Sequence, residues 1–333
     1  MGTRPVLSLV LPIFNEEETI PELDKRLRAF VADIGETWEV VFVDDGSKDR
    51  SLEMLTELAA KEPRYKIIAL SRNFGHQLAI TAGTDVASGD AVVVMDADLQ
   101  DPPEVVHEMI ARWKEGADVV YAVRLKREKE TFFKRVTAAA FYRILARIIN
   151  VTIPLDAGDF RLMSRRVVLT LRALRETHRL VRLMVAWLGF KQSSIYYSRP
   201  ERFAGETKYP FSKMLKLALD GITSFSIVPL RFASWFGVLA GVFGIGTGGW
   251  ALYEKLYGHT VQGWTTLMIV VSLAASGQFL MIGVLGEYVG RIYEEVKRRP
   301  LYVVAREINL APRVLGTHPG TSMAPRPIDI EPD

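Results

Sequence analysis

Two aspartates separated by one residue, Asp96 and Asp98, directly follow the apolar run 91–95, and Gln100 comes two residues later. Carboxylate and amide oxygens are the ligands that Mg²⁺ and Mn²⁺ prefer, and a cation held by two carboxylates keeps positions open for substrate phosphates. The alternative is that both aspartates are ordinary turn residues at the end of a strand. The pair favours metal-assisted binding of a diphosphate, provided that other polar groups meet it.

The elements that position this pair belong to an alternating pattern. Apolar, β-branched runs that predict strands cover residues 6–13, 39–44, 67–71, 91–95 and 119–123. Patterns with a helical period cover residues 17–31, 51–60, 77–87 and 103–114. This alternation predicts an α/β fold with a mostly parallel sheet and helices on its faces.

Polar residues follow the predicted strands at the point where each strand ends. In parallel α/β sheets, ligands bind beyond the carboxyl ends of the strands. The polar residues at the five ends are Asn15, Glu16, Asp44, Asp45, Arg72, Asn73, Asp96, Asp98 and Arg124. We therefore expect one cleft in which carboxylates, amides and guanidinium groups converge.

Two uncharged stretches in the C-terminal third are long enough to cross a membrane. Residues 232–253 form a run of 22 without a charge, and residues 263–286 form a run of 24. A helix of about 20 residues spans a hydrocarbon core of about 30 Å. Their short connection predicts a hairpin, and the lysines and arginines at its outer ends place the N-terminal part in the cytoplasm by the positive-inside rule. The alternative, two core helices of a soluble protein, disagrees with the lack of a polar stripe.

Composition limits the remaining classes of protein. The chain has 333 residues, of which 49% are hydrophobic and 24% charged, with no cysteine and a formal net charge of +3. Disulfides and thiolate metal sites are therefore excluded. The basic amphipathic segment 131–182 is expected either to expose a solvated helix face or to lie on anionic lipid headgroups.

Four motifs carry a resemblance to a known family. They are Leu11-Pro12-Ile13-Phe14-Asn15-Glu16-Glu17, Val43-Asp44-Asp45-Gly46-Ser47, Asp96-Ala97-Asp98-Leu99-Gln100-Asp101-Pro102-Pro103 and Gly158-Asp159-Phe160-Arg161-Leu162. Together they resemble glycosyltransferase family 2, and within it the polyprenyl-phosphate glycosyltransferases of the dolichyl-phosphate-mannose-synthase type, in particular the two-span bactoprenol glucosyltransferases of bacteria. The resemblance covers residues 5–300 and implies a GT-A (Rossmann-like) catalytic domain followed by interfacial helices and a two-helix transmembrane hairpin.

The expected organisation follows from this resemblance. It comprises a cytoplasmic GT-A glycosyltransferase domain over 1–209, an interfacial helix over 210–230, two transmembrane helices over 231–289, a cytoplasmic C-terminal segment over 290–310 and a disordered tail over 311–333. The tail is rich in proline and lacks a periodic apolar pattern. We expect a multi-pass protein of the inner (plasma) membrane.

The resemblance also implies which residues bind the nucleotide sugar. Donor binding is expected of Pro12, Phe14, Glu16, Asp44, Asp45, Asn73, Asp96 and Ala97. Phe14 and Asp45 would bound the base and ribose, and a role in loop structure is the alternative for this pocket. Asp96, Asp98 and Gln100 are the implied ligands of Mg²⁺ or Mn²⁺, which would stabilise the charge on the departing nucleotide.

The implied acceptor is a lipid monophosphate, polyprenyl (undecaprenyl) phosphate. Its phosphate is expected to bind Arg124, Arg161, Arg202 and Lys208, because guanidinium forks suit pairs of phosphate oxygens. For Arg202 and Lys208 the alternative is a cation-rich entry into the bilayer. The implied reaction is a single displacement that inverts the anomeric carbon, with Asp98, Asp159 and Arg161 as catalytic residues. Asp159 would act either as a general base or by orienting Arg161.

Several alternatives stay open. The expected donor is UDP-glucose, because residues 71–77 and the two-span layout are similar to the bacterial glucosyltransferase branch, with GDP-mannose and UDP-linked amino sugars as alternatives. A processive polysaccharide synthase, whose Gln-x-x-Arg-Trp motif the sequence lacks, and a non-catalytic membrane nucleotide-binding protein are the competing functions. Glycine pairs at 237/241, 244/248 and 286/290 and a strand-like segment at 301–305 favour a homo-oligomer, with a tetramer as one form. No nucleic-acid-binding module is visible, so no nucleic-acid partner is expected.

Overall fold

The computed structural model describes residues 4–124, 157–198, 228–257 and 263–310. They form two compact units. An α/β unit consists of residues 4–124, 157–198 and 300–310, and a helical unit consists of residues 228–257 and 263–299. Arg202, Lys208, the predicted tail and most of the predicted interfacial helix lie outside the described residues.

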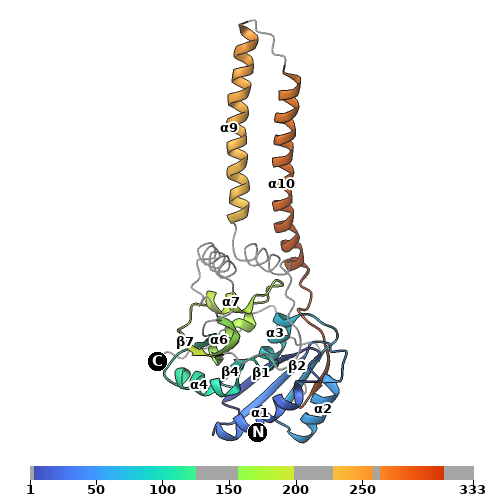
Figure 1. Ribbon diagram of the computed structural model, residues 1–333, viewed down its shortest axis with the longest axis vertical. Helices are drawn as coiled ribbons and strands as arrows, with labels where there is room; N and C mark the ends of the chain where they lie inside the picture. Colours follow the sequence, from blue (N-terminus) through green and yellow to red (C-terminus); the bar gives the residue numbers. More distant parts are fainter. Residues whose placement is uncertain (1–3, 125–156, 199–227, 258–262, 311–333) are drawn as a thin grey trace. The chain divides into compact units, whose positions relative to one another are not determined.

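The α/β unit alternates strands and helices as the sequence predicts (Figure 1). Its elements are β1 (Leu7–Ile13), α1 (Ile20–Asp33), β2 (Trp38–Asp44), α2 (Ser51–Lys61), β3 (Tyr65–Leu70), α3 (His76–Val86), β4 (Ala91–Val94), the 3₁₀ turn η1 (Pro103–Val105), α4 (Val106–Lys114), β5 (Val119–Arg124), β6 (Ala157–Ser164), α6 (Arg165–Ala173), α7 (Val181–Trp187), β7 (Gln192–Tyr197) and β8 (Val304–Ile308). The five predicted strands and the four predicted helices all form, with ends displaced by at most three residues.

The sheet is mostly parallel, which confirms the predicted fold class for this unit. Its strand order is β7-β5-β6-β4-β1-β2-β3-β8. The pairs β1–β2, β1–β4, β2–β3 and β5–β7 are parallel. Two strands run the other way: β6 between β4 and β5, and β8 at the edge beside β3.

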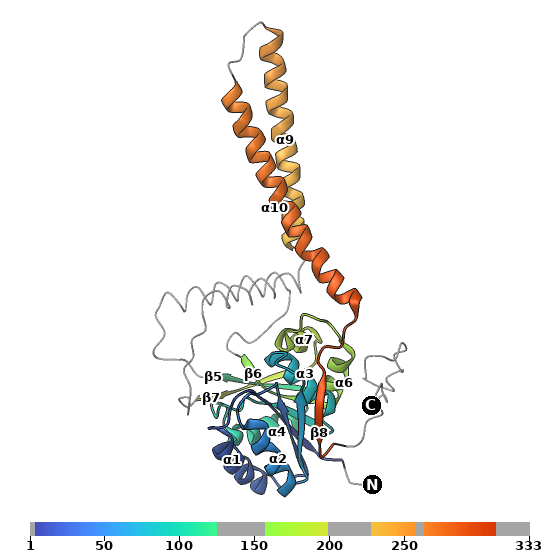
Figure 2. The same cartoon turned by 90° about the vertical axis from the view of Figure 1, so that its right-hand side faces the viewer.

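Helices cover both faces of the sheet, which explains why the central strands read as continuous apolar runs. Every residue of β1 and β2 is buried. Leu9 and Leu11 lie in one cluster with Leu23 of α1, whereas Val10 points to the opposite face, where α3 lies against it. In both views α1, α2 and α4 gather on one side of the sheet and α3, α6 and α7 on the other (Figures 1 and 2).

The antiparallel strand β6 changes what reaches the carboxyl edge of the sheet. Val94, the last residue of β4, is opposite Arg161 in β6. Because β6 runs in reverse, its first residues, including Asp159, extend past the point where β4 ends. One edge therefore combines the carboxyl ends of parallel strands with the amino end of β6.

The segment that follows the helical unit returns to the α/β unit. Residues 304–308 form β8 on β3, slightly later than the predicted segment 301–305. The Tyr302 hydroxyl donates a hydrogen bond to Asp85 Oδ2 at 2.8 Å, and the Asn309 side-chain amide donates to the carbonyls of Ala59 and Tyr65. Since this strand pairs within the chain, it gives no support to an oligomer, which stays a prediction.

The helical unit contains α9 (Val228–Leu256) and α10 (Trp264–Lys297). Both predicted spans lie within these helices. In the described part of the chain, however, one helical stretch, Leu273–Lys297, is long and apolar enough to cross a membrane, and the apolar stretch of α9, Ala233–Thr247, is shorter. Helices therefore form where both spans are predicted, but a two-helix transmembrane hairpin is not confirmed.

The two helices touch at a glycine that the sequence patterns did not single out. A Cβ added to Gly277 of α10 would lie 2.8 Å from Phe236 Cε1 of α9. Of the predicted glycine positions with described side chains, Gly237 lies against Met281, whereas nothing lies within 4 Å of a Cβ at Gly241, Gly244, Gly286 or Gly290. The contact uses Gly277 because the large Phe236 ring needs a neighbour without a side chain.

Candidate active site

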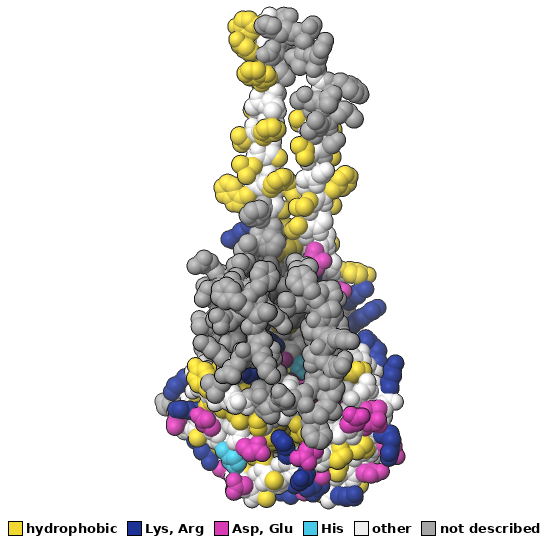
Figure 3. Space-filling model, viewed as in Figure 1, with side chains coloured by type: hydrophobic (Ala, Val, Ile, Leu, Met, Phe, Trp, Pro, Cys, Tyr) yellow, Lys and Arg dark blue, Asp and Glu magenta, His cyan; other side chains and the backbone are white. Residues whose placement is uncertain are grey.

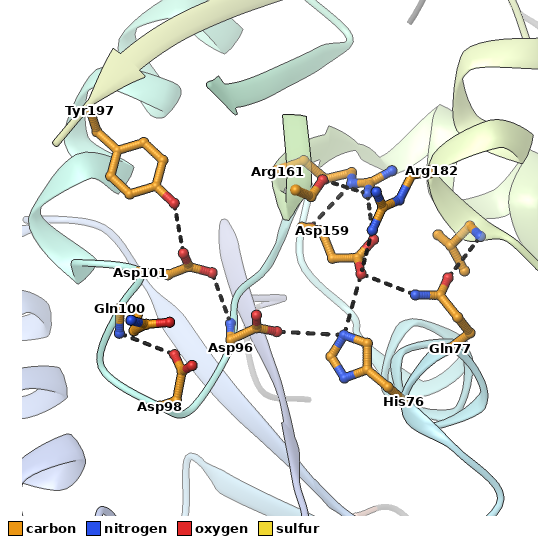
Figure 4. Close-up of polar contacts among 12 residues, drawn as sticks. His76, Gln77, Asp96, Asp98, Gln100, Asp101, Asp159, Arg161, Arg182 and Tyr197 are labelled. Carbon is orange, nitrogen blue, oxygen red and sulfur yellow. Dashed lines mark hydrogen bonds and ion pairs between the residues drawn. The ribbon is translucent and has the colours of Figure 1, made fainter. Parts of the chain in front are cut away.

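The carboxyl edge of the sheet brings together acidic and basic side chains from β4, β6, α3 and α7 (Figure 4). Asp96 follows β4, Asp159 lies near the start of β6, and His76 is the first residue of α3. Arg182 comes from the first turn of α7. Asp96 and Asp159, which are 63 positions apart in the sequence, approach the same imidazole, at 3.5 and 3.4 Å from His76 Nε2.

The Asp159 carboxylate is surrounded by donors. Arg161 Nη2 donates to its Oδ1 at 2.9 Å, and the Gln77 amide donates to its Oδ2 at 3.0 Å. His76 and Arg182 approach Oδ2 at 3.4 and 3.5 Å. Burial alone would raise the pKa of Asp159, but the hydrogen bond from His76 and the charges of Arg182 and Arg161 outweigh it and hold the pKa well below its usual range. This carboxylate is therefore ionised at neutral pH and is a weak proton acceptor.

Arg161 is held in place by the start of its own strand. Only 1% of the residue is exposed. Its Nη2 donates to the Gly158 carbonyl at 3.0 Å, and its Nε donates to the Asp159 carbonyl at 3.2 Å. Among the described residues, Nη1 of this buried guanidinium has no hydrogen-bond partner. Because an unpaired buried donor is costly, this atom is suited to an anionic ligand.

The loop of residues 96–101, here called the metal loop, contains the predicted metal ligands. Burial, then the nearby negative charge of Asp101, raises the pKa of Asp96 to about 6. Asp96 Oδ1 is buried and accepts no hydrogen bond within the described part of the chain. The Asp98 carboxylate accepts the backbone N–H of Gln100 at 3.1 Å, and Leu99 adopts the left-handed conformation with φ of 60°.

The prediction that the oxygens of Asp96, Asp98 and Gln100 turn toward one cation is only partly matched by this arrangement. The Asp96 carboxylate points toward His76, whereas the Asp98 carboxylate lies against the loop backbone beside Gln100 (Figure 4). In the four described segments no group of three or more His, Cys, Asp or Glu side chains is arranged to hold a metal ion. Two carboxylates completed by substrate phosphates are nevertheless a usual Mg²⁺ environment.

The mutual repulsion of the carboxylates around Asp96 also fits a divalent cation. Asp98, Asp101 and Asp159 each raise the pKa of Asp96 through their negative charge. A cation placed among these carboxylates would relieve that repulsion. Asp96 Oδ1, which accepts no hydrogen bond among the described residues and lies 3.5 Å from His76 Nε2, supplies an oxygen for it, so the residues present are compatible with Mg²⁺ or Mn²⁺.

The predicted nucleotide pocket is built on backbone contacts. Asp45 accepts the N–H groups of Phe74 and Gly75 at 2.7 and 2.9 Å, and Asp44 accepts the N–H of Ser47 at 3.3 Å. Burial raises the pKa of both carboxylates. These contacts are the loop-building role that the sequence left as an alternative, so ribose binding by Asp45 stays a prediction. Phe14 is 43% exposed, and an exposed aromatic ring can stack on a base.

The other predicted donor residues differ in what they can offer. Pro12 lies inside β1 opposite Val43. The side chain of Ala97 is buried in the core. Glu16 accepts the Thr19 hydroxyl at 2.7 Å, and Asn73 accepts a hydrogen bond from Arg72 at its backbone carbonyl. Pro12 and Ala97 could therefore contact a nucleotide only through the backbone.

Of the predicted acceptor residues, Arg124 and Arg161 are described. Arg124 ends β5, and a Cβ on Gly158 would come within 3.1 Å of its Nη2. Its buried Nε has no hydrogen-bond partner in the residues that the structure describes. Two guanidinium groups with unpaired N–H donors thus lie at adjacent strands, since β5 pairs directly with β6.

Sequence reasoning missed five residues that complete this arrangement. His76 and Gln77 lie in the segment 71–77, which the sequence analysis relates only to the choice of sugar. Arg182 appears there only as the last residue of the basic segment 131–182. Asp101 was inside a quoted motif without a role. Tyr197, whose hydroxyl donates to Asp101 Oδ1 at 2.8 Å, carried no signal.

A mostly parallel sheet with an acidic cluster beside its carboxyl edge defines a GT-A-like glycosyltransferase domain. The chain belongs to glycosyltransferase family 2, whose model matches residues 8–172 under the description "Glycosyl transferase family 2". The "Uncharacterized glycosyltransferase YkcC" of Bacillus subtilis is 52% identical over 91% of this chain and 94% of the relative. The "Bactoprenol glucosyl transferase" of Shigella phage SfII is 41% identical over 90% of this chain and 97% of the relative.

Among solved structures, glucosyl-3-phosphoglycerate synthase from Mycobacterium tuberculosis, crystallised with Mn²⁺ and UDP, matches with a TM-score of 0.45 and 18% identity. The match covers 66% of this chain and 78% of that one. At this distance the likeness carries no argument about ligands. Family membership rests on the sequence relatives, and it makes this protein a glycosyltransferase.

Proposed function

We propose that this protein transfers glucose from UDP-glucose to a polyprenyl phosphate such as undecaprenyl phosphate. Relatives named bactoprenol glucosyl transferases, about as long as this chain, support the acceptor class and the sugar. The observation that carries the proposal is the buried Arg161, fixed by Asp159 and with Nη1 unpaired, at the edge where the Asp96 carboxylate lies. An anion-binding group beside a diphosphate-binding loop suits a phosphate acceptor.

The donor side of the proposed site consists of the metal loop and the pocket around Phe14. A divalent ion bound by Asp96 and Asp98 would stabilise the charge that develops on the departing UDP. On the protein side, His76 faces Asp96 and the neighbouring Asp159. The exposed Phe14 ring would stack on the nucleotide base.

The acceptor side consists of Arg124 and Arg161, to which Arg202 and Lys208 would be added. A phosphate oxygen attacks the anomeric carbon, the bond from that carbon to the UDP oxygen breaks, and UDP leaves with that electron pair. Because the nucleophile is already an anion near neutral pH, no strong general base is needed. The low pKa of Asp159 supports the second of its two predicted roles, in which it orients Arg161.

The path of the chain restricts how it can cross a membrane. The sheet contains strands that precede both long helices and one strand, β8, that follows them. Since one sheet lies on one side of a membrane, the chain must cross an even number of times between β7 and β8. If α10 crosses, α9 crosses too, and the apolar side chains along both helices in Figure 3 are consistent with this. We therefore propose a multi-pass protein of the plasma membrane with a cytoplasmic catalytic unit.

The experiment is a transfer assay with the full-length protein in detergent. Labelled UDP-glucose, GDP-mannose and UDP-linked amino sugars are each offered with undecaprenyl phosphate and Mn²⁺ or Mg²⁺, with and without EDTA. We expect a lipid-linked product from UDP-glucose that EDTA abolishes. A product from another donor would replace glucose in the proposal, and nucleotide binding without any product would favour the non-catalytic alternative.

Matched variants test the site in the same assay. Asp96→Asn removes a predicted metal ligand that follows the carboxyl end of β4. The control, Asp90→Asn, alters an exposed aspartate that precedes the amino end of β4 and is ion-paired to Arg4. We expect the first variant to lose transfer and the second to retain it. Equal activity of the two variants would remove the metal loop from the proposed mechanism.

A further inference from the structure

Tyr197, the last residue of β7, is tied to the metal loop through one carboxylate. Its hydroxyl donates to Asp101 Oδ1 at 2.8 Å, and Asp101 Oδ2 accepts the backbone N–H of Asp96 at 3.2 Å (Figure 4). Asp101 is 1% exposed and Tyr197 is 5% exposed. A buried chain of two hydrogen bonds thus joins the end of an outer strand to the residue that begins the metal loop.

A guanidinium on the neighbouring strand favours one direction for the Tyr197 proton. Arg124 of β5 is directly opposite Tyr197 in the β5–β7 pairing. Burial works to lower the pKa of Arg124, but its interaction with the Tyr197 hydroxyl and the charge of Asp101 outweigh this and raise the pKa. A guanidinium can only donate, so the phenol oxygen accepts from Arg124 and its proton is directed to Asp101.

Packing restricts the Tyr197 ring to this position. Phe160, between Asp159 and Arg161 in β6, meets the ring edge to face with centroids 5.7 Å apart. The adjacent Tyr196 points to the other side of the strand and is 65% exposed. Tyr196 is therefore a neighbouring tyrosine that lies outside the buried hydrogen-bond chain.

The metal loop needs such an external tie. Leu99 holds a left-handed conformation, which is strained for a residue with a branched side chain. The Asp98 carboxylate accepts the backbone N–H of Gln100 within the same loop. We propose that Asp101 and Tyr197 are positioning residues that hold the metal loop in the shape that binds a divalent cation with a nucleoside diphosphate. This inference rests on the proposed donor-binding function.

Direct binding measurements test it without any need for turnover. Mn²⁺ is titrated into the full-length wild type, Tyr197→Phe and Tyr196→Phe in the presence of UDP, and bound Mn²⁺ is followed by electron paramagnetic resonance. Residues behind a metal ligand typically affect metal affinity 10- to 100-fold, so we expect Tyr197→Phe to weaken Mn²⁺ binding about tenfold. Tyr196→Phe should bind like the wild type.

Further readouts separate positioning from stability. The thermal unfolding midpoint without ligand reports a merely structural role, and Asp101→Asn, which keeps one acceptor oxygen, should also weaken Mn²⁺ binding. A lower midpoint with Mn²⁺ affinity within about threefold of the wild type would overturn the inference, given the usual size of such effects. If the wild type binds Mn²⁺ and UDP but forms no lipid product, the proposed function fails while the variants still decide this inference.

Discussion

At the scale of single residues, Asp159 and Arg161 form one functional pair. They share a hydrogen bond of 2.9 Å, and their side chains are 9% and 1% exposed, respectively. The two possible roles of Asp159, general base or orienting group for Arg161, predict different transfer rates when both residues are replaced. If Asp159 acts on the acceptor through Arg161, replacing both residues lowers the rate little more than replacing one. If the two roles are independent, the two fold-reductions in rate multiply.

A double-mutant cycle is therefore the first prediction. Asp159→Asn and Arg161→Gln should each lower the transfer rate by about 100-fold or more, because each leaves a buried charge without its partner. The double variant should be no more than about threefold slower than the slower single variant. The measurement is kcat/KM for the lipid phosphate at saturating donor.

The same cycle needs evidence that the variants are folded. Binding of UDP, which involves the other side of the site, serves as that control in all three variants. Multiplied effects in a folded double variant would mean that Asp159 has a role of its own, such as proton transfer.

Several site residues could be predicted from sequence because they follow apolar strands. Asp96 and Arg124 occupy such positions, and the rule that ligands bind at the carboxyl ends of strands applies to them. Asp101 and Tyr197 could not be predicted, because their importance lies in a contact between residues 96 positions apart. Only tertiary structure shows which buried polar groups satisfy one another.

At the scale of elements, α3 serves the site with one end and the core with its middle. Its first residues deliver His76 and Gln77, and Gly83 lies against the sheet. A Cβ at Gly83 would be 2.3 Å from Val10 Cγ1 and 2.9 Å from Val43 Cγ2. The close approach of helix and sheet thus depends on this glycine.

We predict that Gly83→Ala destabilises the protein although alanine favours a helix. Overpacking typically costs about 1–3 kcal/mol, against a gain in helix propensity of about 1 kcal/mol. The thermal unfolding midpoint of the full-length protein should fall by about 2–8 °C. Adding Val10→Ala, which removes the nearest methyl group, should recover part of the loss. An unchanged or higher midpoint in Gly83→Ala would show that the sheet yields to the extra carbon.

At the opposite end of the sheet, Glu39 of β2 is a buried carboxylate whose role is structural. It accepts the Ser8 hydroxyl at 2.5 Å and the backbone N–H of Ser88 at 2.6 Å, and it pairs with Lys66. Burial would raise the pKa of Glu39, but the hydrogen bonds from Lys66, Ser8 and Ser88 outweigh it and lower the pKa below its usual 4.5.

A lowered pKa predicts the sign of the dependence of stability on pH. The ionised Glu39 stabilises the fold fully above the unfolded-state pKa of 4.5, and this contribution is lost as pH falls through the folded-state pKa. Glu39→Gln should therefore lower the unfolding midpoint at pH 7, by the equivalent of about 1–3 kcal/mol, with a smaller difference at pH 4. Glu53→Gln, in an exposed ion pair, is the control and should change stability by less than about 0.5 kcal/mol. A difference for Glu39→Gln that grows on acidification would contradict this account.

Sequence analysis did not predict β6 and β7, and the same physical reason explains both omissions. β6 carries Gly158, Asp159 and Arg161, which interrupt the apolar pattern that marks a strand, and the side chains of Asp159 and Arg161 serve the site. β7 begins with exposed and half-buried polar residues before Ile195. Strands that carry a site depart from the pattern of strands that only fill a core.

At the scale of the whole molecule, the order of elements along the chain constrains the topology. The α/β unit is completed by β8 after the chain has passed through α9 and α10. Among the residues that the structure describes, one helical stretch, in α10, is long and apolar enough to span a membrane. A single crossing would place β3 and β8 on opposite sides of the membrane, which their pairing forbids. The sheet therefore requires α9 to cross whenever α10 does.

The absence of native cysteine makes this prediction directly testable. Single cysteines are introduced at Tyr257, exposed at the end of α9, at Lys61 in α2 and at Glu307 in β8. In intact cells a membrane-impermeant maleimide should label Tyr257→Cys alone, because only the tip of the hairpin reaches the outside. Lys61→Cys and Glu307→Cys should react only after the membrane is permeabilised. Labelling of Glu307→Cys but not Lys61→Cys from outside would contradict the pairing of β8 with β3. Protection of all three positions would mean that neither helix crosses.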